Sequence, residues 1–127
     1  MLHQRALVIA AAIGTVAQVA MVVAGHTNPA VAATFAVGGM GLSLLAGVIY
    51  AWLARGAAPA LGALATGGAL AGGICAFLGI LVSRLLGDVP TSLLLLGTIS
   101  SVVTGAIGGA IGKLFASKAA LTGRPVR

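Results

Sequence analysis

Few side chains in this sequence could take part in chemistry, and those that lie well inside the apolar stretches are uncharged. Gln18 lies in the first apolar stretch, and the last stretch carries the hydroxyls of Thr98, Ser101 and Thr104. Carboxamide and hydroxyl groups can replace part of a solute's hydration shell, so these residues would suit a narrow polar path. They also have a structural interpretation, because hydroxyls can bond to carbonyls of their own helix and carboxamides to a neighbouring helix. Both interpretations stay open.

The sequence contains no combination of residues typical of a catalytic or metal site. His3 and His26 flank the first apolar stretch on opposite sides, and no Cys or carboxylate lies at ligand spacing from either. Cys75 is the single cysteine and lies inside an apolar stretch, where a thiol usually packs like a small hydrophobic group. Pumps and transporters often place an ionisable group at mid-membrane, and none lies near the centre of a stretch here. We therefore expect no enzyme activity, no cofactor and no metal.

Long apolar stretches must position these side chains. The chain has 127 residues, of which 60% are hydrophobic and 6% charged, whereas an average soluble domain has about 25% charged residues. The stretches cover about residues 6–24, 29–54, 60–86 and 91–115. At a rise of about 1.5 Å per residue, each can cross a hydrocarbon core of about 30 Å.

The fold prediction follows from these stretches and their short linkers, which contain Gly and Pro. Short linkers place consecutive helices antiparallel. The sequence therefore predicts an all-α, polytopic membrane protein, with four transmembrane helices in an up-down-up-down bundle. Residues 1–127 form a single domain, and about residues 116–127 form a basic C-terminal tail.

Charged residues indicate the orientation of this bundle. The net charge of +6 comes from seven basic residues and one acidic residue. The basic residues lie between or at the ends of the apolar stretches, at Arg5, Arg55, Arg84, Lys113, Lys118, Arg124 and Arg127. Because Lys and Arg concentrate in cytoplasmic loops, we expect both termini in the cytoplasm and Arg84 outside, paired with Asp88 four residues later. This distribution favours a multi-pass protein of a cytoplasmic (inner) membrane and no nucleic-acid partner.

Several side chains are expected to anchor the bundle at the two membrane surfaces. Tyr50 and Trp52, next to Arg55, predict an aromatic and basic belt on the inner side. On the same side, Lys113 and Lys118 begin a basic segment that would attract anionic lipid by about 1 kcal/mol per charge. Arg84 and Asp88 are the expected anchors on the outer side.

Small residues recur at helical spacing, which predicts close helix packing in lipid. The third stretch carries a seam at Gly62, Ala65, Ala69, Gly72, Ala76, Gly79 and Ser83, and the fourth carries one at Gly97, Ser101, Gly105, Gly108 and Gly112. In one interpretation both seams pack within a single bundle. In a second interpretation the stripe on the fourth helix faces another subunit.

Two functions fit these observations. The first is a non-catalytic structural or accessory subunit, which packs through its Gly and Ala seams into a homo-oligomer or a larger membrane complex. The alternative is a small oligomeric channel or transporter with a hydroxyl-lined path along the fourth helix. The lipid bilayer, with anionic lipid at its inner face, is an expected partner in both cases.

Overall fold

The structure of the protein is a computed structural model that describes the backbone of residues 2–122 and the side chains of residues 2–115. The described chain is helical. Its elements, in order, are α1 (Gln4–Thr27), α2 (Pro29–Ala32), α3 (Phe35–Ala54), the 3₁₀ helix η1 (Arg55–Ala57), α4 (Leu61–Leu85) and α5 (Thr91–Thr122). Four helical segments of the described part are long and apolar enough to cross a membrane: Gln4–Thr27, Phe35–Ala57, Leu61–Leu85 and Thr91–Phe115. These segments indicate a multi-pass membrane protein.

The first helix is longer at both ends than the apolar stretch predicts. It begins at Gln4, because the Nδ1 atom of His3 accepts a hydrogen bond of 3.1 Å from the backbone N–H of Ala6 and so caps the helix. It continues to Thr27, so most of the expected linker is helical. Asn28 then caps α2 through its side-chain oxygen, and Pro29 occupies the first turn, where its missing N–H costs nothing.

The second apolar stretch, predicted as one helix over residues 29–54, is interrupted. α2 ends at Ala32 and α3 begins at Phe35. Between them, Thr34 has φ −96° and ψ 1°, and its hydroxyl donates to the carbonyl of Val31 at 2.7 Å. The ring of Phe35 fills the space beside Gly25 of α1. We attribute the break to this local bond and this packing contact, since neither Gly nor Pro marks it in the sequence.

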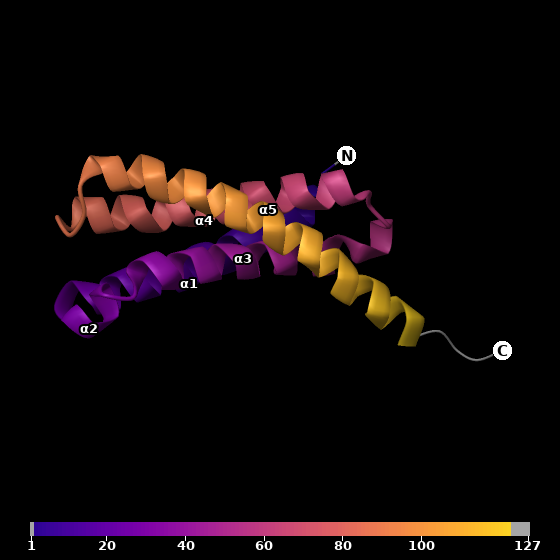
Figure 1. Cartoon of the computed structure of the whole chain (residues 1–127), viewed down its shortest axis with the longest axis horizontal. Helices are drawn as coiled ribbons and strands as arrows, with labels where there is room; N and C mark the ends of the chain where they lie inside the picture. Colours follow the sequence, from indigo (N-terminus) through magenta and orange to yellow (C-terminus); the bar gives the residue numbers. More distant parts are fainter. Residues whose placement is uncertain (1, 123–127) are drawn as a thin grey trace.

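The last helix also differs from its prediction. α5 continues to Thr122 instead of ending near residue 115, so the first part of the expected tail is helical. In Figure 1 the C-terminal third of α5 extends away from the other helices. Lys118, predicted to contact lipid, has its side chain outside the described residues.

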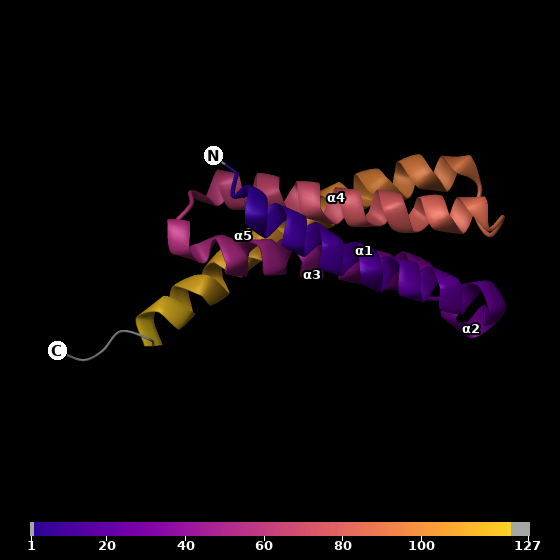
Figure 2. The same ribbon diagram turned by 180° about the vertical axis from the view of Figure 1, so that it is seen from behind.

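The long helices form two hairpins, defined here as α1 to α3 and α4 to α5. α3 and α4 each pack against α1 and α5 and also against one another. Both chain ends lie at the same end of the molecule, where the hairpins meet, and toward the other end the hairpins diverge (Figures 1 and 2). We call the end with the chain termini the closed end and the other the splayed end.

Glycines bring three helices into backbone contact nearer the closed end. Gly105 of α5 lies against the backbone of Gly68 and Gly72 of α4, and a Cβ placed on it would be 3.0 Å from the Cα of Gly72. Gly47 of α3 lies against the backbone of Gly105 and Gly109. No side chain fits between these helices, so we refer to these five residues as the glycine contact.

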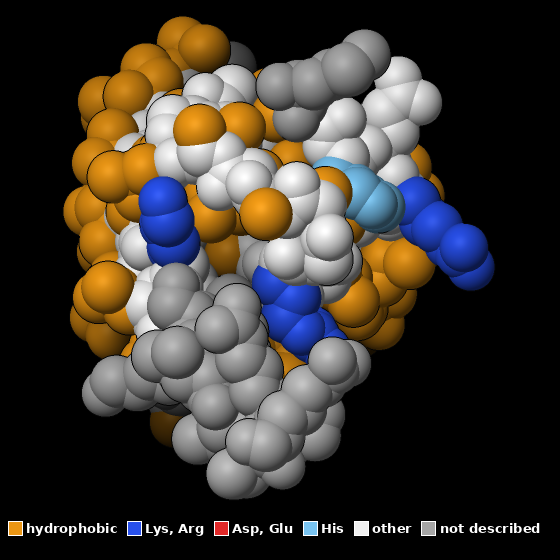
Figure 3. Space-filling view, turned by 90° about the vertical axis from the view of Figure 1, so that its right-hand side faces the viewer, with side chains coloured by type: hydrophobic (Ala, Val, Ile, Leu, Met, Phe, Trp, Pro, Cys, Tyr) orange, Lys and Arg blue, Asp and Glu red, His pale blue; other side chains and the backbone are white. Residues whose placement is uncertain are grey.

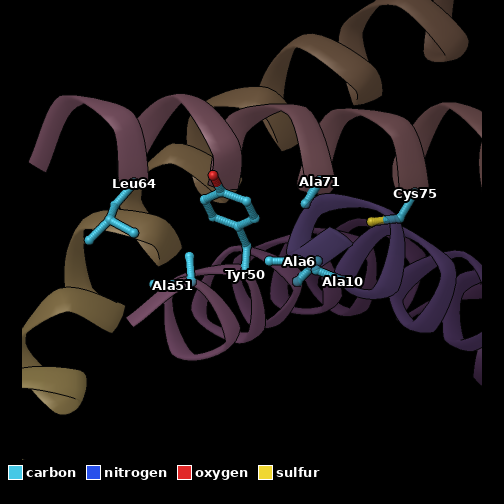
Figure 4. Packing of buried hydrophobic residues seen from close by; sticks show 9 residues of the cluster. Ala6, Ala10, Tyr50, Ala51, Leu64, Ala71 and Cys75 are labelled. Carbon is cyan, nitrogen blue, oxygen red and sulfur yellow. The ribbon is translucent and has the colours of Figure 1, made fainter. Parts of the chain in front are cut away.

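Tyr50, expected to anchor the bundle at the inner membrane surface, is buried in the core instead. Its side chain is only 1% exposed, and its ring lies against Gly67 of α4. The close-up shows the ring of Tyr50 pointing toward α4 (Figure 4). The phenol oxygen accepts a hydrogen bond of 3.1 Å from the backbone N–H of His3. Tyr50 is therefore a core residue, because Gly67 has no side chain to exclude its ring.

Trp52, by contrast, is 41% exposed. The Arg55 guanidinium carbon lies 4.1 Å from the centre of its ring, within the range of a cation–π interaction. Arg55 also donates to the carbonyl of Trp52 at 2.6 Å. This arrangement fits an anchor at a membrane surface.

Candidate functional site

A buried polar cluster joins three helices near the middle of the bundle. The Nε2 atom of Gln18 on α1 donates to the carbonyl of Gly39 at 3.0 Å and contacts the Ser43 hydroxyl at 3.3 Å. On α4, the Cys75 thiol donates to the carbonyl of Gly72 at 3.2 Å and lies 3.8 Å from the Ser43 hydroxyl. Gln18 therefore forms hydrogen bonds to a neighbouring helix, as its structural interpretation predicts.

A pocket of about 220 Å³ lies beside this cluster, between the two hairpins. Its lining comes from all four long helices and the α4–α5 turn: Gln18, Met21, Val22, Phe35, Ala36, Gly39, Met40, Ala76, Ile80, Ser83, Val89, Leu93, Leu96, Gly97, Ser100 and Ser101. These residues place the pocket in the splayed half of the molecule. The walls are mainly apolar, and no lining side chain is charged.

The mouth of the pocket lies between α3 and α5. The exposed lining residues all belong to these two helices: Ala36 and Met40 on α3, and Leu93, Leu96 and Ser100 on α5. The lining residues on α1 and α4 are buried or half-buried. Both helices are candidate membrane spans, so in a bilayer this mouth would open sideways toward the hydrocarbon region.

Toward the closed end, the glycine contact follows directly on the pocket. Ser101 belongs to the lining, and one helical turn farther along α5, Gly105 lies against Gly68 and Gly72. The backbone-to-backbone approach at this level excludes side chains. A solute in the pocket therefore has no open route toward the closed end along these helices.

The expected polar path is present only in part. Of its four residues, Gln18 and Ser101 line the pocket, whereas Thr98 and Thr104 do not. The Thr104 hydroxyl donates to the carbonyl of Ser101 at 3.2 Å, which satisfies it within its own helix. The hydroxyl of Thr98 is buried without a partner among the described residues. The hydroxyls of α5 thus do not form one continuous path.

The small residues of α4 lie in different environments along the predicted seam. Gly72, Ala76, Gly79 and Ser83 are buried, and Ala65 and Ala69 are half-buried. Gly62 is exposed, and a Cβ built on it would meet no atom within 4 Å. Gly62 lies in the first turn of α4, outside the core. The seam therefore contacts the other helices only beyond this residue.

The stripe on α5 packs within the chain, which contradicts the interpretation that it faces another subunit. Gly105 contacts α4, while Gly108 lies against the backbone of Leu44 and Gly112 against Ala51 and Val48 of α3. Ser101 is buried, and Gly97 lies against Ile80. The backbones of α3 and α4 already fill the space that a second copy would need.

A polar contact joins the two hairpins at the splayed end. Nδ1 of His26, in the last turn of α1, lies 2.9 Å from both carboxylate oxygens of Asp88 in the α4–α5 turn. The predicted Arg84–Asp88 pair is wrong, because α4 ends at Leu85 and Gly87 turns the chain with φ 84°. Arg84 instead donates to the Thr91 hydroxyl at 2.9 Å.

Basic side chains are visible at the closed end. Figure 3 looks onto this end and shows Lys, Arg and His side chains among hydrophobic ones, with no acidic side chain on the visible, described surface. Arg5 lies in the first turn of α1, Arg55 follows α3, and Lys113 lies in the later part of α5. The two ends of the molecule therefore differ in charge, because Asp88 lies at the other end.

Comparison with known proteins gives no further guide to the site. No protein-family model matches the chain, and neither a curated protein nor a solved structure is significantly similar to it. Among the described residues, no group of three or more His, Cys, Asp or Glu side chains could hold a metal ion.

Proposed function

We propose that this protein is a small, non-catalytic membrane transporter that binds its solute in the pocket between the two hairpins. The observation that carries this proposal is the pocket itself, which is lined by all four long helices and has both apolar walls and buried polar groups. Binding sites between the helices of a bundle commonly combine apolar walls with a few polar groups that orient the ligand. The proposal modifies the transporter hypothesis from the sequence: the solute would bind in a pocket between the hairpins and not along a hydroxyl-lined path on the fourth helix.

The unequal contacts at the two ends of the pocket support this proposal. The glycine contact closes the inner end through backbone packing of α3, α4 and α5. At the splayed end the polar bridge between the hairpins is His26–Asp88. Carriers expose a central site to one side of the membrane at a time by rocking one helical unit against another. Here the two hairpins would be those units.

The proposed membrane orientation places the closed end in the cytoplasm. Arg5, Arg55 and Lys113 would then lie on the inner side, and His26 and Asp88 on the outer side, in agreement with the positive-inside rule. The four spans would alternate in direction, in an up-down-up-down bundle of a cytoplasmic membrane. Lys113, with Lys118 beyond it, would contact anionic lipid.

Occupancy of the pocket can be tested with toluene as an apolar probe. We expect toluene to raise the thermal unfolding temperature of the detergent-solubilised protein, because a ligand that binds only the folded state stabilises it. Ala36→Phe should abolish this rise, since Ala36 flanks the mouth. Val37→Phe is the matched control, because Val37 is 77% exposed and lies outside the lining. Equal rises in both variants would contradict the proposal.

A structural or accessory role is the second candidate, and the length of α5 favours it. α5 has 32 residues, from Thr91 to Thr122, which is longer than the roughly 20 residues that cross a bilayer, and its C-terminal part leaves the other helices (Figure 1). A protruding helix can pack against a second copy or a membrane-protein partner. Mass measurement in mild detergent tests this role, and a monodisperse monomer that co-purifies with no other protein would argue against it.

A further inference from the structure

The pocket contains three polar side chains whose oxygens lack a partner in the described part of the chain. Gln18 and Ser83 are each 2% exposed and Ser101 is 3% exposed. The Ser83 hydroxyl is buried without a hydrogen bond. Gln18 bonds through Nε2, leaving its Oε1 without a donor, and no bond is made by the Ser101 hydroxyl. All three residues line the same pocket.

These groups specify what a ligand must supply. Of the three oxygens, the Ser83 hydroxyl is the one that is fully buried without a hydrogen bond, which costs about 1 to 3 kcal/mol, so a ligand that satisfies it gains affinity. The carboxamide oxygen of Gln18 can only accept, which calls for a hydroxyl or N–H donor on the ligand. The hydroxyls of Ser83 and Ser101 can either donate or accept.

The absence of charged side chains from the lining and the volume of the pocket narrow the class of ligand further. An ion would enter this pocket without a charged partner, because no lining side chain is charged, and burial of an unpaired charge is very costly. The volume of about 220 Å³ exceeds the roughly 150 Å³ of an apolar cavity known to hold benzene. There is room for one substituted ring or an aliphatic group of similar bulk.

We propose that the pocket binds a small uncharged molecule with a ring-sized apolar body and at least one hydrogen-bond donor, such as a phenol or a compact alcohol. This inference rests on the proposed function and adds the ligand class. The apolar body would lie against Met21, Ile80 and Leu93. The donor would reach Gln18 Oε1, and the serine hydroxyls would complete the polar contacts. The sideways mouth suits such a molecule, because it dissolves in the bilayer.

Phenol and toluene provide the test, since they differ by a hydroxyl in place of a methyl group. Dissociation constants for both are measured by titration of the full-length protein in detergent, and protein-free micelles of the same detergent correct for partition into the micelle. We expect phenol to bind more tightly than toluene. Ser83→Ala and Ser101→Ala should each weaken the binding of phenol about fivefold, the equivalent of about 1 kcal/mol, and leave the binding of toluene unchanged. Thr104→Ala is the control, because its hydroxyl bonds within α5.

The outcomes separate this inference from the proposed function. Suppose that Ala36→Phe blocks binding of both probes but phenol binds no more tightly than toluene, or that the serine variants bind phenol as the unmodified protein does. The proposed ligand class is then wrong, and the proposed function as a binding pocket is retained. If Ala36→Phe blocks neither probe, the proposed function fails and the ligand class fails with it. A phenol preference that disappears in Ser83→Ala supports both.

Discussion

At single positions, the lack of a β-carbon determines how closely the helices of this protein can approach. Gly68 and Gly105 allow carbonyl oxygens and α-carbons of α4 and α5 to touch. Membrane helices gain much of their association energy from such close packing, since lipid provides no hydrophobic force between them. The sequence predicts this seam on α5. It does not distinguish a glycine in contact from one that faces outward, because Gly62 and Gly68 have the same side chain.

Gly68→Ala and Gly62→Ala form a matched pair on one helix. Both changes add the same methyl group, and Ala has the higher helix propensity. At Gly68 the new Cβ would overlap the Gly105 carbonyl, so we expect a loss of about 1 to 3 kcal/mol from overpacking. At Gly62 the Cβ meets open space, so stability should be unchanged or higher. Thermal unfolding in detergent measures both, and equal effects would contradict the packing described.

Ser83 and Ser43 are both buried but differ in their partners. Ser83→Ala removes a hydroxyl without a hydrogen bond, so the unliganded protein should become more stable, by up to about 1 kcal/mol. Ser43→Ala removes a hydroxyl that donates to the carbonyls of Gly39 or Gly72 and contacts Gln18, so it should destabilise by about 1 kcal/mol. Unfolding temperatures that fall by the same amount in both variants would show that Ser83 is satisfied.

Among the elements, the helices with strong apolar character are predicted well and their interruptions are not. Four helices long and apolar enough to cross a membrane are present in the described residues, as expected from stretches that match the thickness of a bilayer. The break between α2 and α3 depends on the Thr34–Val31 bond and on Phe35 packing against Gly25. The second of these is a contact between helices. A single-sequence pattern carries no record of such contacts.

The contact between His26 and Asp88 also joins separate elements, since it links α1 to the α4–α5 turn across 62 residues of sequence. A double-mutant cycle with His26→Gln and Asp88→Asn should give a coupling of at most about 1 kcal/mol, because both side chains are partly exposed. The coupling should decrease at high salt.

Arg84→Gln provides the control for this cycle. Arg84 bonds Thr91 and not Asp88, so its effect on unfolding should add to that of Asp88→Asn. A coupling between Arg84 and Asp88 larger than that between His26 and Asp88 would restore the pairing expected from their spacing of four residues.

For the whole molecule, composition and periodicity predict the class of protein but not its pocket. Gln18 and Ser101 were identifiable in the sequence as polar residues within spans. The spacing of small residues places Ser83 only in a packing seam, and nothing in the pattern places it beside Gln18. The pocket arises because the hairpins pack tightly at the glycine contact and diverge toward α2 (Figures 1 and 2). That divergence is a property of three-dimensional packing.

The most direct test of the transporter proposal is whether the pocket opens to both sides of the membrane. In a Cys75→Ala background, Ser101→Cys places the only thiol in the pocket lining. Right-side-out and inside-out vesicles are treated with a membrane-impermeant thiol reagent, and Thr104→Cys serves as the control outside the lining. We predict that Ser101→Cys is labelled in both kinds of vesicle and that phenol slows the labelling. Labelling in only one kind, with or without phenol, would contradict the account.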